Sequence, residues 1–200
     1  MADILDRIHG PADLRTLGED ELTTLAAEVR GLILETVAKN GGHLGSNLGV
    51  VELTLALHLA FDSPRDKIVW DVGHQCYTHK ILTGRRDRFA GLRRCGGLLG
   101  FPCREESEHD AFNTGHASTA LSAALGMAVA RDKAGEAHHV VAVVGDGSLT
   151  GGVALEALNQ IGHLRERLII VLNYNEMSIS INVGAWSKYF SYLVSGQRYI

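Results

Sequence analysis

The sequence predicts an α/β domain in which a parallel sheet carries helices on both faces. Two short β-branched runs, 140–144 and 168–172, have the composition of strands that are buried on both sides. The spacing between the ends of these runs fits a strand–helix–strand unit, with residues 151–161 as the crossover helix. Strand and helix patterns also alternate through the rest of the chain, which is typical of a parallel sheet covered by helices.

The first half of the chain supplies three helices and one strand to this prediction. Residues 19–40 have apolar side chains at helical spacing, and the Gly41–Gly42 pair ends this amphipathic helix. Residues 50–61 form a second, largely buried helix. Residues 67–70 are a short strand that places 71–75 at the same sheet edge, and 75–82 are helical.

The second half begins with a long loop and returns to a regular pattern. Residues 95–113 are rich in Gly, Pro and charge, and a loop of this length in a compact domain is usually functional or mobile. Residues 118–133 form an Ala-rich helix, with Ser118 or Thr119 as its cap. The strand–helix–strand unit follows, and the pattern fades after Asn175.

Composition narrows the range of partners. The 200 residues are 46% hydrophobic, and the net charge of −4 gives no reason to expect nucleic acid as a partner. No apolar run reaches the length of a membrane span, and the first residues do not resemble a signal peptide. Cys76, Cys95 and Cys103 lack the spacing of a zinc site and fit reduced thiols in a cytoplasmic protein.

Basic residues gather between positions 80 and 94. A solvated helix face and loop is the preferred interpretation, and contact with a phosphorylated substrate is the alternative, since guanidinium groups bind phosphate well. The residues concerned are Lys80, Arg85, Arg86, Arg88, Arg93 and Arg94.

The most informative feature predicts a magnesium–diphosphate clamp at two strand ends. Asp146 follows the first run within Gly-Asp-Gly, and Asn175 follows the second. Carboxylate, amide and backbone carbonyl oxygens suit Mg²⁺, and they leave positions for diphosphate oxygens. The N–H groups of Gly147 and Ser148 can bind phosphate where the crossover begins. The simpler alternative is a tight turn with Asp146 as a helix cap. The sequence contains neither GxGxxG nor a P-loop.

Three histidines follow glycine at predicted element boundaries, where a side chain can reach a cleft. They are His43, His74 and His116. Histidine can bind phosphate or transfer protons near neutral pH, although a single histidine is more often a structural hydrogen-bonding residue.

Five longer strings give a specific resemblance. They are GHLGSNLGVVELTLALH (42–58), DVGHQCYTHKILTGRRDRF (71–89), GFPCREESEHDAF (100–112), TGHASTALSAALGMAVARD (114–132) and GDGSLTGGVALEALNQIG (145–162) followed by LIIVLNYNEMSIS (168–180). Together they resemble the 1-deoxy-D-xylulose-5-phosphate synthases, which are transketolase-like enzymes. The likeness runs from about residue 8 to about residue 185, with departures at Cys76, Tyr174, Ile181 and Trp186.

The resemblance implies a thiamine-diphosphate-binding fold of the diphosphate-binding (PP) type. It also implies thiamine diphosphate and Mg²⁺ as cofactors, pyruvate and D-glyceraldehyde 3-phosphate as substrates, and a cytoplasmic homodimer serving isoprenoid, thiamine and pyridoxal synthesis. Such a domain normally has further strands. We therefore expect residues 1–200 to be one N-terminal domain, incomplete at its C-terminus, without the pyrimidine-binding and C-terminal domains.

The resemblance also implies a role for each candidate site residue. His43 would handle substrate protons above the reactive carbon, and His74 would contact the diphosphate. The other implied cofactor contacts are Gly115, His116, Ala117, Gly147, Ser148 and Asn175. The implied magnesium ligands are Asp146, Asn175 and the carbonyl of Met177.

Two alternatives stay open at this point. The chain could be the N-terminal subunit of a split transketolase. It could instead be a non-catalytic, degenerate fragment that binds diphosphate weakly or serves only as an interaction module. In the synthase family the glutamate that activates the cofactor comes from the second domain. The 200 residues alone are therefore expected to provide half a cofactor site and little or no synthase activity.

Overall fold

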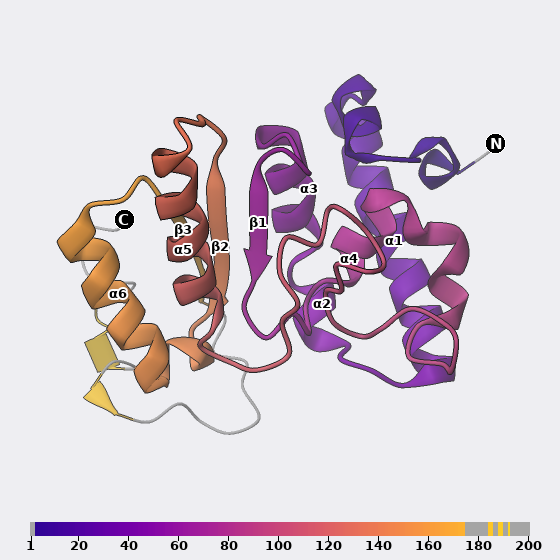
Figure 1. Ribbon diagram of the computed structural model, residues 1–200. Coiled ribbons are helices and arrows are strands. Elements are labelled where there is room, and N and C mark those ends of the chain that lie inside the picture. Colours follow the sequence, from indigo (N-terminus) through magenta and orange to yellow (C-terminus); the bar gives the residue numbers. More distant parts are fainter. Residues whose placement is uncertain (1–2, 175–183, 186–187, 190–191, 193–200) are drawn as a thin grey trace.

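Three parallel strands form the centre of the molecule, in the order β1–β2–β3 (Figure 1). The computed structural model describes residues 3–174, 184–185, 188–189 and 192. The strands are β1 (Lys67–Trp70), β2 (Val140–Gly145) and β3 (Ile169–Asn173). Their register pairs Lys67 with Val140 and Gly145 with Asn173, so the carboxyl ends of the strands meet at one edge. The predicted α/β class and the three predicted strands are confirmed.

Helices cover both faces of this sheet, with α1, α3 and α4 on one side and α5 and α6 on the other (Figure 1). The helices are α1 (Glu19–Asn40), α2 (Gly45–Leu48), α3 (Val51–Ala60), α4 (Tyr77–Lys80), α5 (Ala120–Lys133) and α6 (Gly152–Leu164). Shorter helical turns are Ile4–Arg7, Pro11–Thr16, Ile81–Arg85, Arg86–Gly91 and Gly147–Thr150.

Alternate residues of each strand serve two separate hydrophobic layers, because successive side chains point to opposite faces. Trp70 and Val143 belong to the layer that contains α1, α3 and α4. Val69, Ala142 and Val144 belong to the layer that contains α5 and α6. Burial on both faces explains why β1 and β2 read as apolar runs. The prediction that 168–172 is buried on both sides was wrong, because Ile169 is exposed and the rest of β3 is only partly buried.

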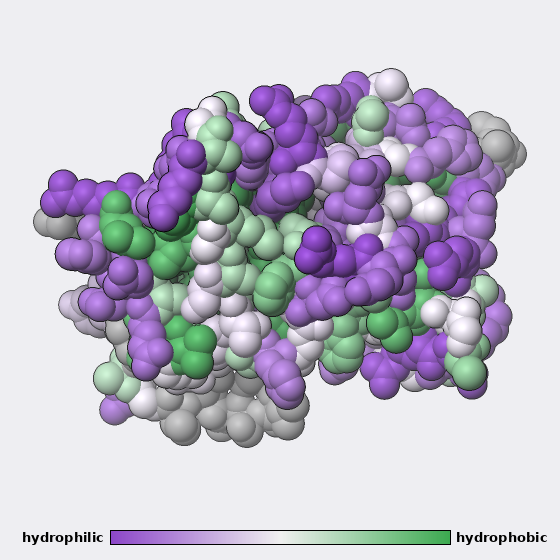
Figure 2. All heavy atoms as spheres, viewed as in Figure 1, coloured by the Kyte–Doolittle hydropathy of each residue, from purple (hydrophilic) through white to green (hydrophobic). Residues whose placement is uncertain are grey.

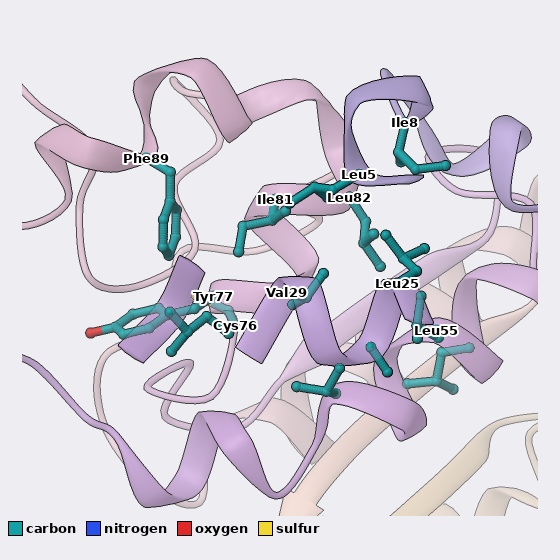
Figure 3. Packing of buried hydrophobic residues seen from close by; sticks show 14 of the residues in the cluster. Leu5, Ile8, Leu25, Val29, Leu55, Cys76, Tyr77, Ile81, Leu82 and Phe89 are labelled. Carbon is teal, nitrogen blue, oxygen red and sulfur yellow. The ribbon is translucent and has the colours of Figure 1, made fainter. Parts of the chain in front are cut away.

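The first layer is built largely on α1. Leu25, Val29 and Ile33 recur at helical spacing and are fully buried against the segment that follows β1. Figure 3 shows Val29 and Leu25 facing Ile81 and Leu82 across this layer. The helix begins where the Glu21 carboxylate accepts the Gly18 N–H, and it ends at Gly41, whose φ is +74°.

The second layer depends on small side chains. Ala120, Ala124 and Ala128 form a fully buried stripe on α5, which lets this helix lie close to the sheet. The crossover helix α6 contributes Ala154 and Ala157 to the same layer. Helix α6 therefore joins β2 to β3 as the strand–helix–strand prediction required.

The basic residues between positions 80 and 94 do not all lie on a solvated surface, as the preferred interpretation required. Lys80 and Arg85 are buried, not solvated, because both are paired with carboxylates of the long loop, Glu106 and Asp110. Arg88, Arg93 and Arg94 are exposed, as expected. The predicted helix at 75–82 is also shorter at its start, since α4 begins at Tyr77.

Hydrophilic residues cover most of the face seen in Figure 2, and apolar residues gather over the α5–α6 half. Val153 and Leu164 of α6 are among the large apolar side chains that are exposed. None of the helices in the described residues combines the length and the apolar composition needed to cross a bilayer.

Candidate active site

The site begins with Asp71, which directly follows β1. Its carboxylate is buried and accepts the backbone N–H groups of Ser118 and Ala120 at 2.8 and 3.0 Å. Asp71 therefore caps α5 from a different segment of the chain. The prediction that Ser118 or Thr119 supplies the cap was wrong, because neither side chain makes a capping hydrogen bond.

Ser118 instead links this loop to the end of β2. Its Oγ donates to the carbonyl of Ser148 at 2.7 Å, and its own φ is +74°. Gly151 permits this approach, since a Cβ there would lie 2.0 Å from the Ser118 Oγ. Two hydrogen-bonded links, Asp71 to Ser118 and Ser118 to Ser148, thus tie the 71–75, 114–118 and 145–148 segments together at the carboxyl edge of the sheet.

Asp146 lies between β2 and a short 3₁₀ helix, Gly147–Thr150. It is buried, and its N–H donates to the carbonyl of Asn173 on β3 at 3.3 Å. Its side chain makes no capping hydrogen bond to the 3₁₀ helix, which disfavours the simple helix-cap alternative. Gly147 and Ser148 start this 3₁₀ turn and not α6, which begins at Gly152.

His43 and His74 are brought together, although 31 positions separate them in the printed sequence. Their ring centroids lie 5.3 Å apart in an edge-to-face arrangement. The Asn47 Nδ2 donates to the carbonyls of His43 and His74 at 2.6 and 2.7 Å, and its Oδ1 accepts the Tyr77 N–H at 2.9 Å. Asn47 is fully buried. We had not selected it from the sequence, where only its position between two motif glycines marks it.

The surroundings keep both imidazoles neutral. His43 is exposed, but neighbouring protein atoms partly desolvate its ring and lower its pKa, and the positive charge of Arg93 lowers it further. Burial also lowers the pKa of His74, as does His43, while Asp71 partly opposes these effects. A neutral imidazole can donate through one ring nitrogen and accept through the other, as proton transfer requires.

Several buried polar atoms near these histidines have no hydrogen-bond partner in the part of the chain that the structure describes. They are His74 Nδ1, Gln75 Nε2 and Thr114 Oγ1. Buried polar groups are normally paired, and exceptions often mark a place where another molecule binds. These atoms fit a polar cofactor at the loops 71–75 and 114–118.

Gly73 holds the same loops in close contact. Its φ is +83°, and a Cβ would lie 2.2 Å from the Pro102 Cδ and 2.4 Å from the Thr114 Oγ1. The preceding residue, Val72, also has a positive φ of +58°, which is rare for a β-branched residue. Such strain persists only where the surrounding structure enforces it, and it occurs most often at functional sites.

Gly73→Ala is expected to destabilise the protein by about 1–3 kcal/mol through overpacking and strain. Thermal unfolding measures the change. Gly126→Ala is the matched control, because Gly126 lies on the exposed face of α5 with no atom near its Cβ position. That control is expected to be neutral or stabilising by up to about 1 kcal/mol. Equal stability of the two variants would contradict the close contact at Gly73.

A hollow of about 460 Å³ adjoins the 114–118 loop. It is lined by Phe112, Gly115, His116, Thr119 and Val153, among others. Gly115, His116 and the neighbouring Ala117 are exposed, so a ligand can reach them.

A sequence profile described as 1-deoxy-D-xylulose-5-phosphate synthase matches residues 5–200. The chain belongs to this family. It is 62% identical over 199 residues to a 1-deoxy-D-xylulose-5-phosphate synthase 1 of Geobacter sulfurreducens, and 63% identical over 196 residues to a synthase of Desulforudis audaxviator. These matches cover 100% and 98% of the chain but 31% of each relative, so the chain spans about a third of their length.

The fold of this synthase-family chain also resembles a solved transketolase. The transketolase of Campylobacter jejuni matches with a TM-score of 0.70 and 24% identity, over 84% of this chain and 30% of the transketolase. This likeness confirms the expected transketolase-like fold. The identity of this chain to the synthases, 62% and 63%, is much higher than its 24% identity to this transketolase.

The structure of this synthase-family chain joins most of the predicted site segments but not all. His74, the loop Gly115–Ala117 and the turn Gly147–Ser148 belong to the hydrogen-bonded loops, and His43 adjoins His74. Asn175 and Met177 lie outside the described residues, so of the predicted magnesium ligands the structure places Asp146 alone. Within the described ranges, no group of three or more His, Cys, Asp or Glu side chains could hold a metal ion.

Proposed function

We propose that this chain forms the thiamine-diphosphate- and Mg²⁺-binding portion of a 1-deoxy-D-xylulose-5-phosphate synthase. That enzyme condenses pyruvate with D-glyceraldehyde 3-phosphate and releases carbon dioxide. The observation that carries the proposal is the joining of the loops 71–75, 114–118 and 145–148 at one sheet edge by Asp71 and Ser118. The carboxyl edge of a parallel sheet is where α/β proteins bind their ligands.

Thiamine diphosphate, when bound, supplies the nucleophilic carbon and the electron sink that decarboxylation needs. The residues of this chain bind and orient it. Asp146 provides a carboxylate oxygen for Mg²⁺, with Asn175 and the Met177 carbonyl as the other protein ligands. The N–H groups of Gly147 and Ser148 donate to the diphosphate.

The two imidazoles take different roles. His74 Nδ1 is buried and has no partner among the described residues. When the cofactor is bound, this nitrogen would donate to the diphosphate. His43 is exposed, and its lowered pKa leaves it neutral, so it can accept and return a substrate proton. The residues that bind the pyrimidine ring, the activating glutamate and the arginines for the aldehyde phosphate belong to the other two thirds of the enzyme. We also propose that the enzyme is a cytoplasmic homodimer in the synthesis of isoprenoid precursors, thiamine and pyridoxal.

Asp146→Ala is expected to weaken thiamine diphosphate binding at least about tenfold when Mg²⁺ is present, because it removes a charged metal ligand. Titration calorimetry with and without Mg²⁺ measures the affinity. Glu156→Ala removes the same charge from the exposed face of α6 and serves as the control. Unchanged affinity in Asp146→Ala, or binding that does not depend on Mg²⁺, would favour a non-catalytic protein.

Activity separates the remaining alternatives. The full-length protein that carries this segment is expected to turn over pyruvate with D-glyceraldehyde 3-phosphate, and the 200 residues alone are expected to bind cofactor with little or no turnover. Preference for a ketose donor over pyruvate would identify a transketolase instead.

A further inference from the structure

A short segment of the long loop, residues 99–103, lies across the two histidine loops; we call it the strap. The ring centroid of Phe101 is 6.2 Å from that of His43, in an edge-to-face arrangement. Pro102, the next residue, occupies the space left by the missing side chain of Gly73. The strap therefore touches both the segment that carries His43 and the segment that carries His74.

Two carboxylates hold the two ends of the strap. Glu106 Oε1 accepts the N–H of Leu99 at 2.6 Å. Asp110 Oδ2 accepts the N–H of Cys103 at 2.7 Å. The main chain is thus fixed on either side of Phe101 and Pro102 by side chains from the second half of the same loop.

The same two carboxylates also bind buried cations. Glu106 Oε2 accepts from Lys80, and Asp110 accepts both terminal nitrogens of Arg85 at 2.6 and 2.9 Å. Lys80 and Arg85 are buried, and they follow the His74 loop directly, in α4 and the turn after it. The strap is consequently tied to the segment that begins at His74, although no strap residue pairs with these cations itself among the described contacts.

We propose that Glu106 and Asp110 are positioning residues that hold the strap against His43 and Gly73 and so fix the two histidine loops for cofactor binding. This proposal rests on the proposed function. Neither residue needs to touch the cofactor. Glu106 binds Lys80 through one oxygen and the Leu99 N–H through the other, and Asp110 Oδ2 accepts from both Arg85 and the Cys103 N–H. A pair that served stability alone would need only the cation.

The chain's own three cysteines lie in the strap, in the core and on the surface, so thiol labelling can test whether the strap is held. Cys103 belongs to the strap and is buried, Cys76 is fully buried in the first hydrophobic layer, and Cys95 is exposed. Burial raises the pKa of the Cys76 thiol to about 12, and burial together with the Glu105 carboxylate raises that of Cys103. In a Cys95→Ser background, labelling of Cys103 reports opening of the strap, and labelling of Cys76 reports opening of the core.

Glu106→Ala is expected to speed Cys103 labelling roughly 10- to 100-fold, as loss of a hydrogen bond to a charged group predicts, and to leave Cys76 labelling unchanged. Thiol labelling at one pH, followed by peptide mass spectrometry, measures both rates. Glu106→Gln, which keeps an oxygen for Leu99 but loses the charge opposite Lys80, should give a smaller increase. Glu108→Ala changes an exposed carboxylate of the same loop and is the control.

Affinity for thiamine diphosphate and Mg²⁺, measured by calorimetry on the same variants, tests the positioning role. We expect Glu106→Ala to lower it about tenfold and Glu108→Ala to leave it unchanged. Equal acceleration at Cys103 and Cys76 would show a purely structural role, and no acceleration would show that the strap is not held. Faster Cys103 labelling with unchanged affinity would also overturn the proposal. If the unaltered protein does not bind the cofactor, the proposed function itself has failed.

Discussion

Replacing Asp110 with alanine is expected to lower the free energy of unfolding by about 3–5 kcal/mol, since it leaves buried charges without their partner. The Asp110 carboxylate is fully buried and accepts from Arg85 and from His79 Nε2, the latter at 2.9 Å. Arg85 cannot lose its proton, so its charge stays in the protein interior. The His79 Nδ1 in turn lies 2.9 Å from the His58 Nε2, which extends the buried network.

Chemical denaturation of Asp110→Ala beside Glu108→Ala measures this effect. Glu108 is exposed on the same loop, and its variant is expected to stay within about 0.5 kcal/mol of the unaltered protein. A loss below about 1 kcal/mol in Asp110→Ala would show that solvent or a rearranged Glu106 compensates Arg85.

Lowering the pH should remove the stabilisation that the Asp110 carboxylate provides. Burial alone would raise the pKa of Asp110, but the hydrogen bonds and charges of His79 and Arg85 outweigh it and hold that pKa far below its ordinary value of 3.8. We assign the effect mainly to Arg85, because burial lowers the pKa of His79 and keeps it neutral. Asp110 therefore contributes its full stabilisation above that ordinary value, and the contribution declines as the pH falls below it.

Denaturation at a series of acidic pH values checks the sign. The difference between the unaltered protein and Asp110→Ala should be constant above the ordinary pKa and should shrink below it, by up to about 1.4 kcal/mol per pH unit. A difference that grows in acid would contradict the assignment.

Asp71→Ala is expected to cost about 2–4 kcal/mol, because the N–H groups of Ser118 and Ala120 would lose their buried acceptor. The start of α5 would also lose its only link to the end of β1 among the described side-chain hydrogen bonds. Hydrogen exchange should locate the change at residues 118–121, and calorimetry should show weaker cofactor binding. Thr119→Ala is the control, since the Thr119 side chain bonds only the nearby His116 carbonyl. Equal protection of α5 in both variants would contradict the role of Asp71.

Sequence pattern was sufficient for the sheet and its helices. The apolar runs at 140–144 and 168–172 predicted two neighbouring strands, and the spacing between them predicted a crossover helix. Burial was predicted correctly for the first run, whereas the second forms the partly exposed strand β3. The motif residues could then be assigned to one edge of the sheet, because the carboxyl ends of parallel strands meet there. His43 and His74 were assigned to the site by family resemblance alone, and the structure adds that their rings lie side by side.

Pairings between distant polar residues could not be predicted in the same way. Lys80 and Arg85 were expected to be solvent-exposed, because their partners, Glu106 and Asp110, lie in a loop without periodicity. The sequence predicts a cap of α5 from Ser118 or Thr119, but the cap comes from Asp71, 47 positions before Ser118. Charge and capping residues indicate which hydrogen bonds are needed, and only the fold decides which residues make them.

We expect the hydrogen bonds of Asn47 to make the two histidine segments open together. Its single amide forms hydrogen bonds with main-chain groups of His43, His74 and Tyr77. Local unfolding of either segment would therefore leave a buried polar group of the other without a partner. The Tyr77 amide proton should therefore exchange with solvent at the rate at which the His43 segment unfolds locally. The arrangement of the two imidazoles would then be either fully formed or fully lost, without intermediate forms.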